Sequence, residues 1–223
     1  MANVYRIHQQ KKRNFFSNLS VNTILILLNL FAFIIFTLLL SLKIVPFDFI
    51  AIKPSNIFQG KYLWTFLTSM FMHGNFLHIF ANMLTLFFIG GLLERILGAK
   101  RYFYFYLISG LFAGIFFVLL SLIFTNEFNT FAVGASGALF GLIGLLVILT
   151  PNLPVFIMFI PIPIKMKYAA PGILIVLWII SIVGNIGIGN TAHLGGLIAG
   201  LVYGVYLKNK YRNKTSYISK VFS

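Results

Sequence analysis

Long apolar runs, separated by short polar or basic stretches, fill this chain from residue 21 onward. A transmembrane helix needs roughly 20 consecutive, mainly apolar residues. Six segments approach that requirement: about 21–42, 76–94, 101–124, 136–150, 168–184 and 190–207. The pattern predicts an all-α membrane protein, a single bundle of six transmembrane helices.

Prolines mark the interval between the fourth and fifth segments. Pro151 and Pro154 follow the fourth segment, and three more prolines interrupt the stretch before the fifth run: Pro161, Pro163 and Pro171. Proline removes backbone donors that lipid cannot replace. The sequence therefore predicts that Val155–Lys167 is a connector at the membrane surface and not a seventh helix.

Composition agrees with a membrane protein. Of 223 residues, 60% are hydrophobic and only 9% are charged, which is too apolar for a soluble domain of this size. The net charge of +14 does not indicate nucleic-acid binding, because the basic residues cluster between the apolar runs. The lipid bilayer is the expected partner. The chain has no cysteine, which excludes disulfides, thiolate nucleophiles and cysteine-bound zinc.

The basic residues also predict the orientation of the bundle. If the N-terminus is cytoplasmic, the outer segments contain only Lys43, Lys53 and Lys61 of the 17 lysines and arginines. The positive-inside rule then places both termini in the cytoplasm. We expect a basic tail over 1–20, a six-helix domain over 21–207 and a second basic tail over 208–223, with the tails suited to anionic headgroups.

Three polar residues stand inside apolar runs, each near the start of its own segment: His78, Ser136 and His193. With this topology the second, fourth and sixth helices all run from outside to inside. The three residues can therefore share one layer just below the outer surface. Polar groups are costly in hydrocarbon, so a serine and a histidine at one depth suggest a nucleophile and its base.

Ser136 lies in the sequence Gly134-Ala135-Ser136-Gly137. The flanking glycines permit a tight turn and the close approach of another backbone. A serine at a helix start also has unpaired N–H groups beside it, which can hold an oxyanion. The alternative is that Ser136 is simply the N-cap of its helix.

Glycines predict how the helix of His193 meets the helix of Ser136. Gly196, Gly200 and Gly204 recur every fourth residue, and the fourth segment offers its own glycines, Gly137, Gly141 and Gly144. Small residues allow close helix packing in membranes. Phe140, one turn below Ser136, can then pack on the imidazole. The alternative for His193 is a buried histidine bonded to a backbone carbonyl.

His78 and Asn82 are four residues apart and share a helix face. With the N–H of Ser136 they are candidates for an oxyanion hole, or else they join helices by hydrogen bonds. His73 is expected to lie in the preceding loop.

Acidic residues are scarce, being only Asp48, Glu94 and Glu127. None is close to His193 in sequence, so a Ser–His dyad fits better than a triad. Glu94 is expected to pair with nearby cations or to cap local backbone. Zinc is not favoured, because the His-Glu-x-x-His motif is missing.

Together these motifs resemble the rhomboid family of intramembrane serine proteases. The resemblance rests on His73-x4-His78-x3-Asn82, Gly134-x-Ser136-Gly137 and Ala192-His193-x2-Gly196-x3-Gly200, in that order, and on Gly90-Gly91-Leu92-Leu93-Glu94. It covers about residues 20–207.

The resemblance implies a protease without a cofactor that cleaves single-pass transmembrane proteins. Ser136 would be the nucleophile and His193 the base, with His78, Asn82 and the Ser136 N–H as the oxyanion hole. It further implies a cap at Gly184–Asn190 and a gate at the fifth helix, with Trp178. One departure is Trp64-Thr65, where the family often has Trp-Arg.

Two other functions remain open from the sequence. A non-proteolytic relative would bind membrane clients without cutting them, although such relatives usually lose the serine or the histidine. A solute transporter is disfavoured by the lack of intramembrane carboxylates and of internal repeats. A prokaryotic plasma membrane is the expected location.

Overall fold

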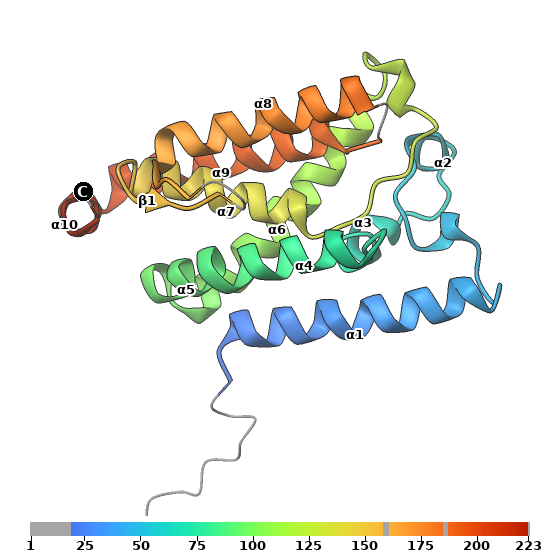
Figure 1. Cartoon of the computed structure of the whole chain (residues 1–223), viewed down its shortest axis with the longest axis horizontal. Helices are drawn as coiled ribbons and strands as arrows, with labels where there is room; N and C mark the ends of the chain where they lie inside the picture. Colours follow the sequence, from blue (N-terminus) through green and yellow to red (C-terminus); the bar gives the residue numbers. More distant parts are fainter. Residues whose placement is uncertain (1–18, 158–160, 185–186, 223) are drawn as a thin grey trace, which may run out of the picture.

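The computed structural model describes residues 19–157, 161–184 and 187–222. Within these ranges, the six apolar segments are confirmed as helical (Figure 1). They form α1 (Val21–Ser41), α4 (Phe76–Thr85) with its continuation α5 (Gly91–Leu97), α6 (Ala99–Leu120), α7 (Ser136–Leu149), α8 (Met166–Gly184) and α9 (Asn190–Lys210). The π-helical turn η3 (Leu86–Gly90) joins α4 to α5.

The long helices lie side by side and alternate in direction (Figure 1). In Figure 1, α4, α7 and α9 run from right to left, whereas α1, α6 and α8 run from left to right. The first turns of α4, α7 and α9 therefore lie toward the same side of the bundle. Apolar helices that each bury one side against their neighbours pack in this alternating arrangement.

Among the described residues, four helices are long and apolar enough to cross a bilayer: α1, α4 with α5, α6 and α8. The protein is thus mostly helical and is a multi-pass membrane protein. Helix α7 is shorter, at 14 residues, and equally apolar.

Helix α7 is the core of the bundle, since most of its residues are buried. It packs against α6, α8 and α9. The predicted glycine contact between α7 and α9 is confirmed: a Cβ on Gly196 would overlap the carbonyl of Gly137, and one on Gly200 would lie 2.7 Å from the amide nitrogen of Leu145. Gly204 instead faces the side chain of Ile148.

Helix α1 is held at its N-terminus by Glu94 of α5. The two carboxylate oxygens accept hydrogen bonds from the backbone N–H groups of Val21 and Asn22, at 2.8 and 2.9 Å. The expectation that Glu94 pairs with cations or caps local backbone was wrong. Its carboxylate instead caps the start of a helix that is distant in sequence, where the first N–H groups have no partner within their own helix. Tyr102 of α6 adds a 2.6 Å hydrogen bond to the side chain of Asn22.

The segment between α7 and α8 contains a small hairpin, so the fold is not strictly all-α. Strand β1 (Pro154–Val155) pairs antiparallel with β2 (Ile164–Lys165). The prediction that this segment is not a seventh helix is confirmed for its described residues up to Lys165, and α8 already begins at Met166. Pro171, however, lies inside α8 and does not precede it, where it cannot donate the helical hydrogen bond to the carbonyl of Lys167.

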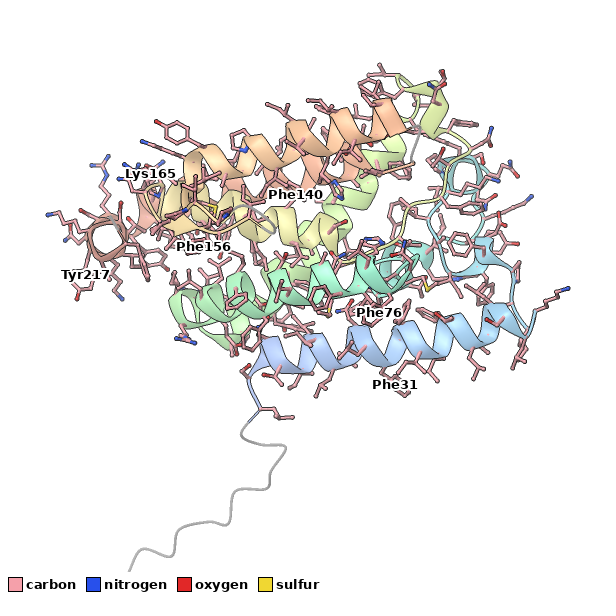
Figure 2. The ribbon with its side chains drawn as sticks, viewed as in Figure 1. Phe31, Phe76, Phe140, Phe156, Lys165 and Tyr217 are labelled. Carbon is pink, nitrogen blue, oxygen red and sulfur yellow. The ribbon has the colours of Figure 1, made fainter. Side chains whose placement is uncertain are left out.

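The C-terminal segment, expected as a tail, forms the short helix α10 (Arg212–Val221). In Figure 1 this helix is seen end-on, across the end of the bundle where α9 finishes. Figure 2 shows Tyr217 and Lys165 at the same end of the molecule.

The long segment between α1 and α4 is folded against the bundle. It contains η2 (Phe47–Phe49), α2 (Pro54–Phe58) and α3 (Thr65–Thr68). The Trp64 indole donates to the carbonyl of Phe49 at 2.9 Å, and the buried Thr65 hydroxyl donates to the carbonyl of Tyr62 at 2.7 Å. Both bonds join residues within this segment.

Candidate active site

A tight turn brings the chain into α7 at Ser136. Gly134 has φ of +120°, a value that only glycine adopts easily. Its N–H donates to the carbonyl of Ser69 at 2.8 Å, which fixes the turn to the end of α3. A Cβ on Gly137 would lie 2.7 Å from the Cβ of Ala113, so this glycine allows α6 to approach. Both glycines are therefore needed for packing around Ser136.

The side chains of Ser136 and His193 contact each other across α7 and α9. The distance from Ser136 Oγ to His193 Nε2 is 2.8 Å. Helix α7 has no side-chain cap, and Ser136 is its first residue and not its N-cap. The two alternatives, a capping serine and a histidine bonded to a carbonyl, are therefore not what the structure contains.

The imidazole ring of His193 is contacted on its face as well as at Nε2. Its ring stacks on Phe140, with centroids 4.6 Å apart and planes 18° from parallel. The side chain is only 7% exposed. Figure 2 shows Phe140 in the interior of the bundle. Stacking and burial together restrict the imidazole to one orientation.

The other ring nitrogen of His193, Nδ1, has no hydrogen-bond partner among the described residues. The three acidic side chains have other partners: Glu94 accepts from the start of α1, Asp48 accepts from Asn56, and Glu127 accepts from the hydroxyl of Thr191. The geometry is that of a Ser–His pair and not of a triad. Nor do the described histidines and carboxylates form a cluster of three that could hold a metal ion.

His78 lies on the other side of Ser136. A Cβ on Gly134 would stand 2.7 Å from His78 Nε2 and 3.6 Å from Ser136 Oγ, so both polar atoms face the space that this glycine leaves. The N–H of Gly74 points to His78 Nδ1 at 3.4 Å. A ring nitrogen that accepts a hydrogen bond carries no proton, so Nε2 is the donor of a neutral His78.

Asn82 is buried one turn further along α4, and its amide donates to the carbonyl of His78 at 2.7 Å. This bond lies within one helix, so Asn82 does not join two helices through it. An amide group has two N–H donors.

His73 is in the loop before α4, as expected, and is fully buried. Its Nε2 accepts from the N–H of Ala135 at 3.4 Å, directly before Ser136. Its ring meets that of His78 edge-on, with centroids 5.0 Å apart. Burial, reinforced by His78, lowers the pKa of His73 to about 3, so the ring is neutral and can accept this bond.

Two further residues around the site were missed from the sequence. Asn75 is the N-cap of α4 and accepts from the N–H of His78 at 2.8 Å, a role that an asparagine before an apolar run could have signalled. Glu127, in the 3-10 turn η4 (Thr125–Glu127), accepts a 2.5 Å hydrogen bond from the hydroxyl of Thr191. No local sequence signal links these two residues, which are 64 positions apart.

The expected cap, Gly184–Asn190, is only partly described, because residues 185 and 186 lie outside the described ranges. The expected gate helix is α8, which contains Trp178 and is exposed along one side at Ile175, Ile179 and Ile182.

Comparison with known proteins adds an independent observation. The family profile of the Rhomboid domain matches residues 60–210. This range includes every residue of the site described above.

Individual relatives agree. RHOMBOID-like protein 1 of Arabidopsis thaliana is 37% identical over 69% of this chain and 37% of its own length. Rhomboid protein 1, mitochondrial, of Saccharomyces cerevisiae is 30% identical over 62% of this chain and 40% of its own. Rhomboid protease GluP of Bacillus subtilis is 32% identical over 66% of this chain and 26% of its own. The chain thus spans less than half the length of these relatives. On the strength of the family match and these identities, this chain belongs to the rhomboid family.

Proposed function

We propose that this protein is an intramembrane serine endopeptidase that cleaves transmembrane segments near the outer membrane face. The observation that carries the proposal is the 2.8 Å contact between Ser136 Oγ and His193 Nε2, made by the first turns of two helices inside a membrane protein. A relative that is named a protease, from Bacillus subtilis, supports the same reaction class.

The proposed reaction is acyl transfer through Ser136. Its Oγ attacks the carbonyl carbon of the scissile peptide bond while Nε2 of His193 takes the hydroxyl proton. The same proton then passes from Nε2 to the leaving nitrogen, and the C–N bond breaks to give an ester on Ser136. Water, deprotonated by His193, hydrolyses the ester and restores the free hydroxyl.

Stabilisation of the tetrahedral intermediate falls to His78, Asn82 and the backbone N–H of Ser136. Donors pre-aimed at a developing negative charge are usually the largest single contribution to such catalysis. The space beside Gly134, which His78 Nε2 and Ser136 Oγ both face, is suited to a carbonyl oxygen. His73, Gly134, Gly137 and Phe140 support these groups without contacting the substrate.

The proposed topology has six membrane spans and both ends of the bundle's chain in the cytoplasm, with one domain over 21–207 between two basic flanking segments. The common start of α4, α7 and α9 is then the outer end. Helix α7 has 14 residues, and at about 1.5 Å per residue it is about 9 Å shorter than a 30 Å hydrocarbon core. If α7 ends at the inner boundary, Ser136 lies below the outer one, within reach of water.

The substrates of such a site are single-pass transmembrane proteins, which enter from the lipid. A helix hides its carbonyls in internal hydrogen bonds, so a substrate must unwind locally before Ser136 reaches it. Helix-breaking residues near the cleavage site are therefore expected. We place the protein in a prokaryotic plasma membrane, to whose anionic inner surface the basic flanks are suited.

A cleavage assay in proteoliposomes tests the proposal. Wild type is expected to cut a model transmembrane substrate that contains a helix-breaking residue, and Ser136→Ala and His193→Ala are expected to leave it intact. If wild type binds the substrate but does not cut it, the protein is a non-proteolytic binder of membrane clients. If Ser136→Ala cuts as fast as wild type, the proposed nucleophile is wrong.

A further inference from the structure

A carboxylate from the loop between α6 and α7 holds the first turn of α9. The hydroxyl of Thr191 donates to Oε2 of Glu127 at 2.5 Å. Burial raises the pKa of Glu127, while hydrogen bonds from the hydroxyl and the backbone N–H of Thr191 act in the opposite direction. Thr191 is 2% exposed, so its hydroxyl is withdrawn from solvent and needs this acceptor.

The start of α9 has no cap of its own. Its N-cap residue is Gly189, which has no side chain, and the helix has no side-chain cap. First turns of helices fray when their N–H groups lack partners. Glu127 is therefore in the place where a local capping residue would otherwise act.

The loop that presents Glu127 is itself anchored. The carbonyl of the next residue, Phe128, accepts from the N–H of Ser55 at 3.0 Å, and its ring stacks on Phe58 at 5.9 Å. Further along, Ile52 and Ala132 exchange two backbone hydrogen bonds, at 3.2 and 2.9 Å. The carboxylate is thus a fixed point to which α9 is attached.

Thr191 is two residues before His193. A movement of this first turn would shift the imidazole along or around the axis of α9, away from Ser136 Oγ. The 2.8 Å contact between His193 and Ser136 leaves little tolerance for such a shift, because misplacements on the order of 1 Å reduce rates by large factors.

We propose that Glu127 is a positioning residue for His193, and that it acts through its hydrogen bond to Thr191. The inference rests on the proposed function, since it concerns the alignment of the proposed base. Glu127 contacts neither Ser136 nor the place of the scissile bond; it fixes the helix turn that presents the imidazole.

The test uses the full chain in proteoliposomes with three readouts: the rate at which a fluorophosphonate labels Ser136, kcat and KM for cleavage, and Tm. Glu127→Ala is expected to lower the labelling rate and kcat by on the order of tenfold with KM little changed. Glu127→Gln keeps an acceptor oxygen and is expected to stay within about twofold of wild type. Asp48→Ala, the matched change at another outer-loop acid, is expected to leave both rates unchanged.

Substitutions at Thr191 test whether Glu127 acts through its hydrogen bond to this residue. Thr191→Val is expected to lower the labelling rate and kcat as much as Glu127→Ala does, whereas Thr191→Ser, which keeps the hydroxyl, is expected to retain both. The double variant Glu127→Ala/Thr191→Val is expected to lower them no further than either single change.

The inference is overturned if Glu127→Ala labels and cleaves like wild type. It is also overturned if Glu127→Gln is as slow as Glu127→Ala, or if the loss follows only a lower Tm and a smaller folded fraction. Failure of wild type to label at all would instead overturn the proposed function.

Discussion

The ring of Phe140 lies against the imidazole of His193, with centroids 4.6 Å apart and planes 18° from parallel. Phe140 follows Ser136 by four residues, so the two side chains are on the same face of α7. Helix α7 thus contacts the histidine twice, at its Nε2 edge through Ser136 and on its face through Phe140. The alignment of the proposed nucleophile and base depends on this one helix face.

Replacing Phe140 is expected to slow catalysis without unfolding the protein. Phe140→Leu keeps most of the volume but loses the stacking, which contributes about 1 kcal/mol, and kcat is expected to fall by roughly fivefold. Phe140→Tyr keeps the flat ring and is expected to retain activity. Phe31→Leu, on the exposed side of α1, is the control for the same change at a lipid-facing position (Figure 2). Equal kcat for wild type and Phe140→Leu would mean that stacking does not position His193.

The glycine contact between α7 and α9 predicts a large difference between two similar substitutions. A Cβ on Gly200 would lie 2.7 Å from the backbone nitrogen of Leu145, whereas one on Gly172 of α8 would have no atom within 4 Å. Gly200→Ala is expected to separate α7 from α9, lower Tm markedly and abolish cleavage. Gly172→Ala is expected to be neutral or to stabilise by about 0.5–1 kcal/mol.

Those expectations are checked by thermal unfolding in detergent together with the cleavage assay. If Gly200→Ala has the Tm and activity of wild type, the close contact between the backbones of α7 and α9 is not needed for stability or cleavage.

Glu94 is expected to stabilise the packing of α1 against the rest of the bundle. Glu94→Gln removes the charge from two hydrogen bonds that cap α1, and a hydrogen bond to a charged group contributes about 2 kcal/mol. We expect a lower Tm and faster proteolysis within α1. Arg95→Gln, at the exposed neighbouring position, is the matched control and is expected to leave both unchanged. Equal Tm values for wild type and Glu94→Gln would contradict this role.

His73 is expected to make stability depend on pH in the acid range. The pKa of His73 is lowered from 6.5 to about 3, mainly by burial, in a loop outside the membrane-spanning helices. Between these values the unfolded chain binds a proton at His73 that the folded chain does not bind. Its contribution to stability is therefore complete above pH 6.5 and is lost progressively as the pH falls toward 3.

The measurement is Tm as a function of pH for wild type and for His73→Gln, which cannot take up that proton. The variant is expected to lose less Tm than wild type between pH 6.5 and pH 3. Parallel curves for the two proteins would show that His73 is not held neutral by its burial.

Much of the fold was predictable because hydrophobic periodicity and glycine spacing are local signals. The apolar runs predicted where the chain is helical, and the four-residue spacing of Gly196 and Gly200 predicted the contact with α7. The grouping of His78, Ser136 and His193 at one end followed from alternating helix direction. These features depend on a few residues each, and every one of them is visible along the chain.

The contacts and elements that could not be predicted depend mainly on segments that are distant in sequence. Glu94 and Val21, or Glu127 and Thr191, are brought together only by the finished bundle, and no spacing rule connects them. The hairpin of Pro154–Val155 with Ile164–Lys165 is too short for an alternating pattern. The helix at Arg212–Val221 is polar, so no apolar run marked it.

The central claim, that His193 activates Ser136, is tested most directly by mapping a fluorophosphonate adduct by mass spectrometry. In wild type the adduct is expected on Ser136 alone, and its rate of formation is expected to fall by about a hundredfold or more in His193→Ala, since activation by a general base contributes on the order of 10²–10⁴. An adduct on another serine, or equal labelling of Ser136 with and without His193, would contradict the account.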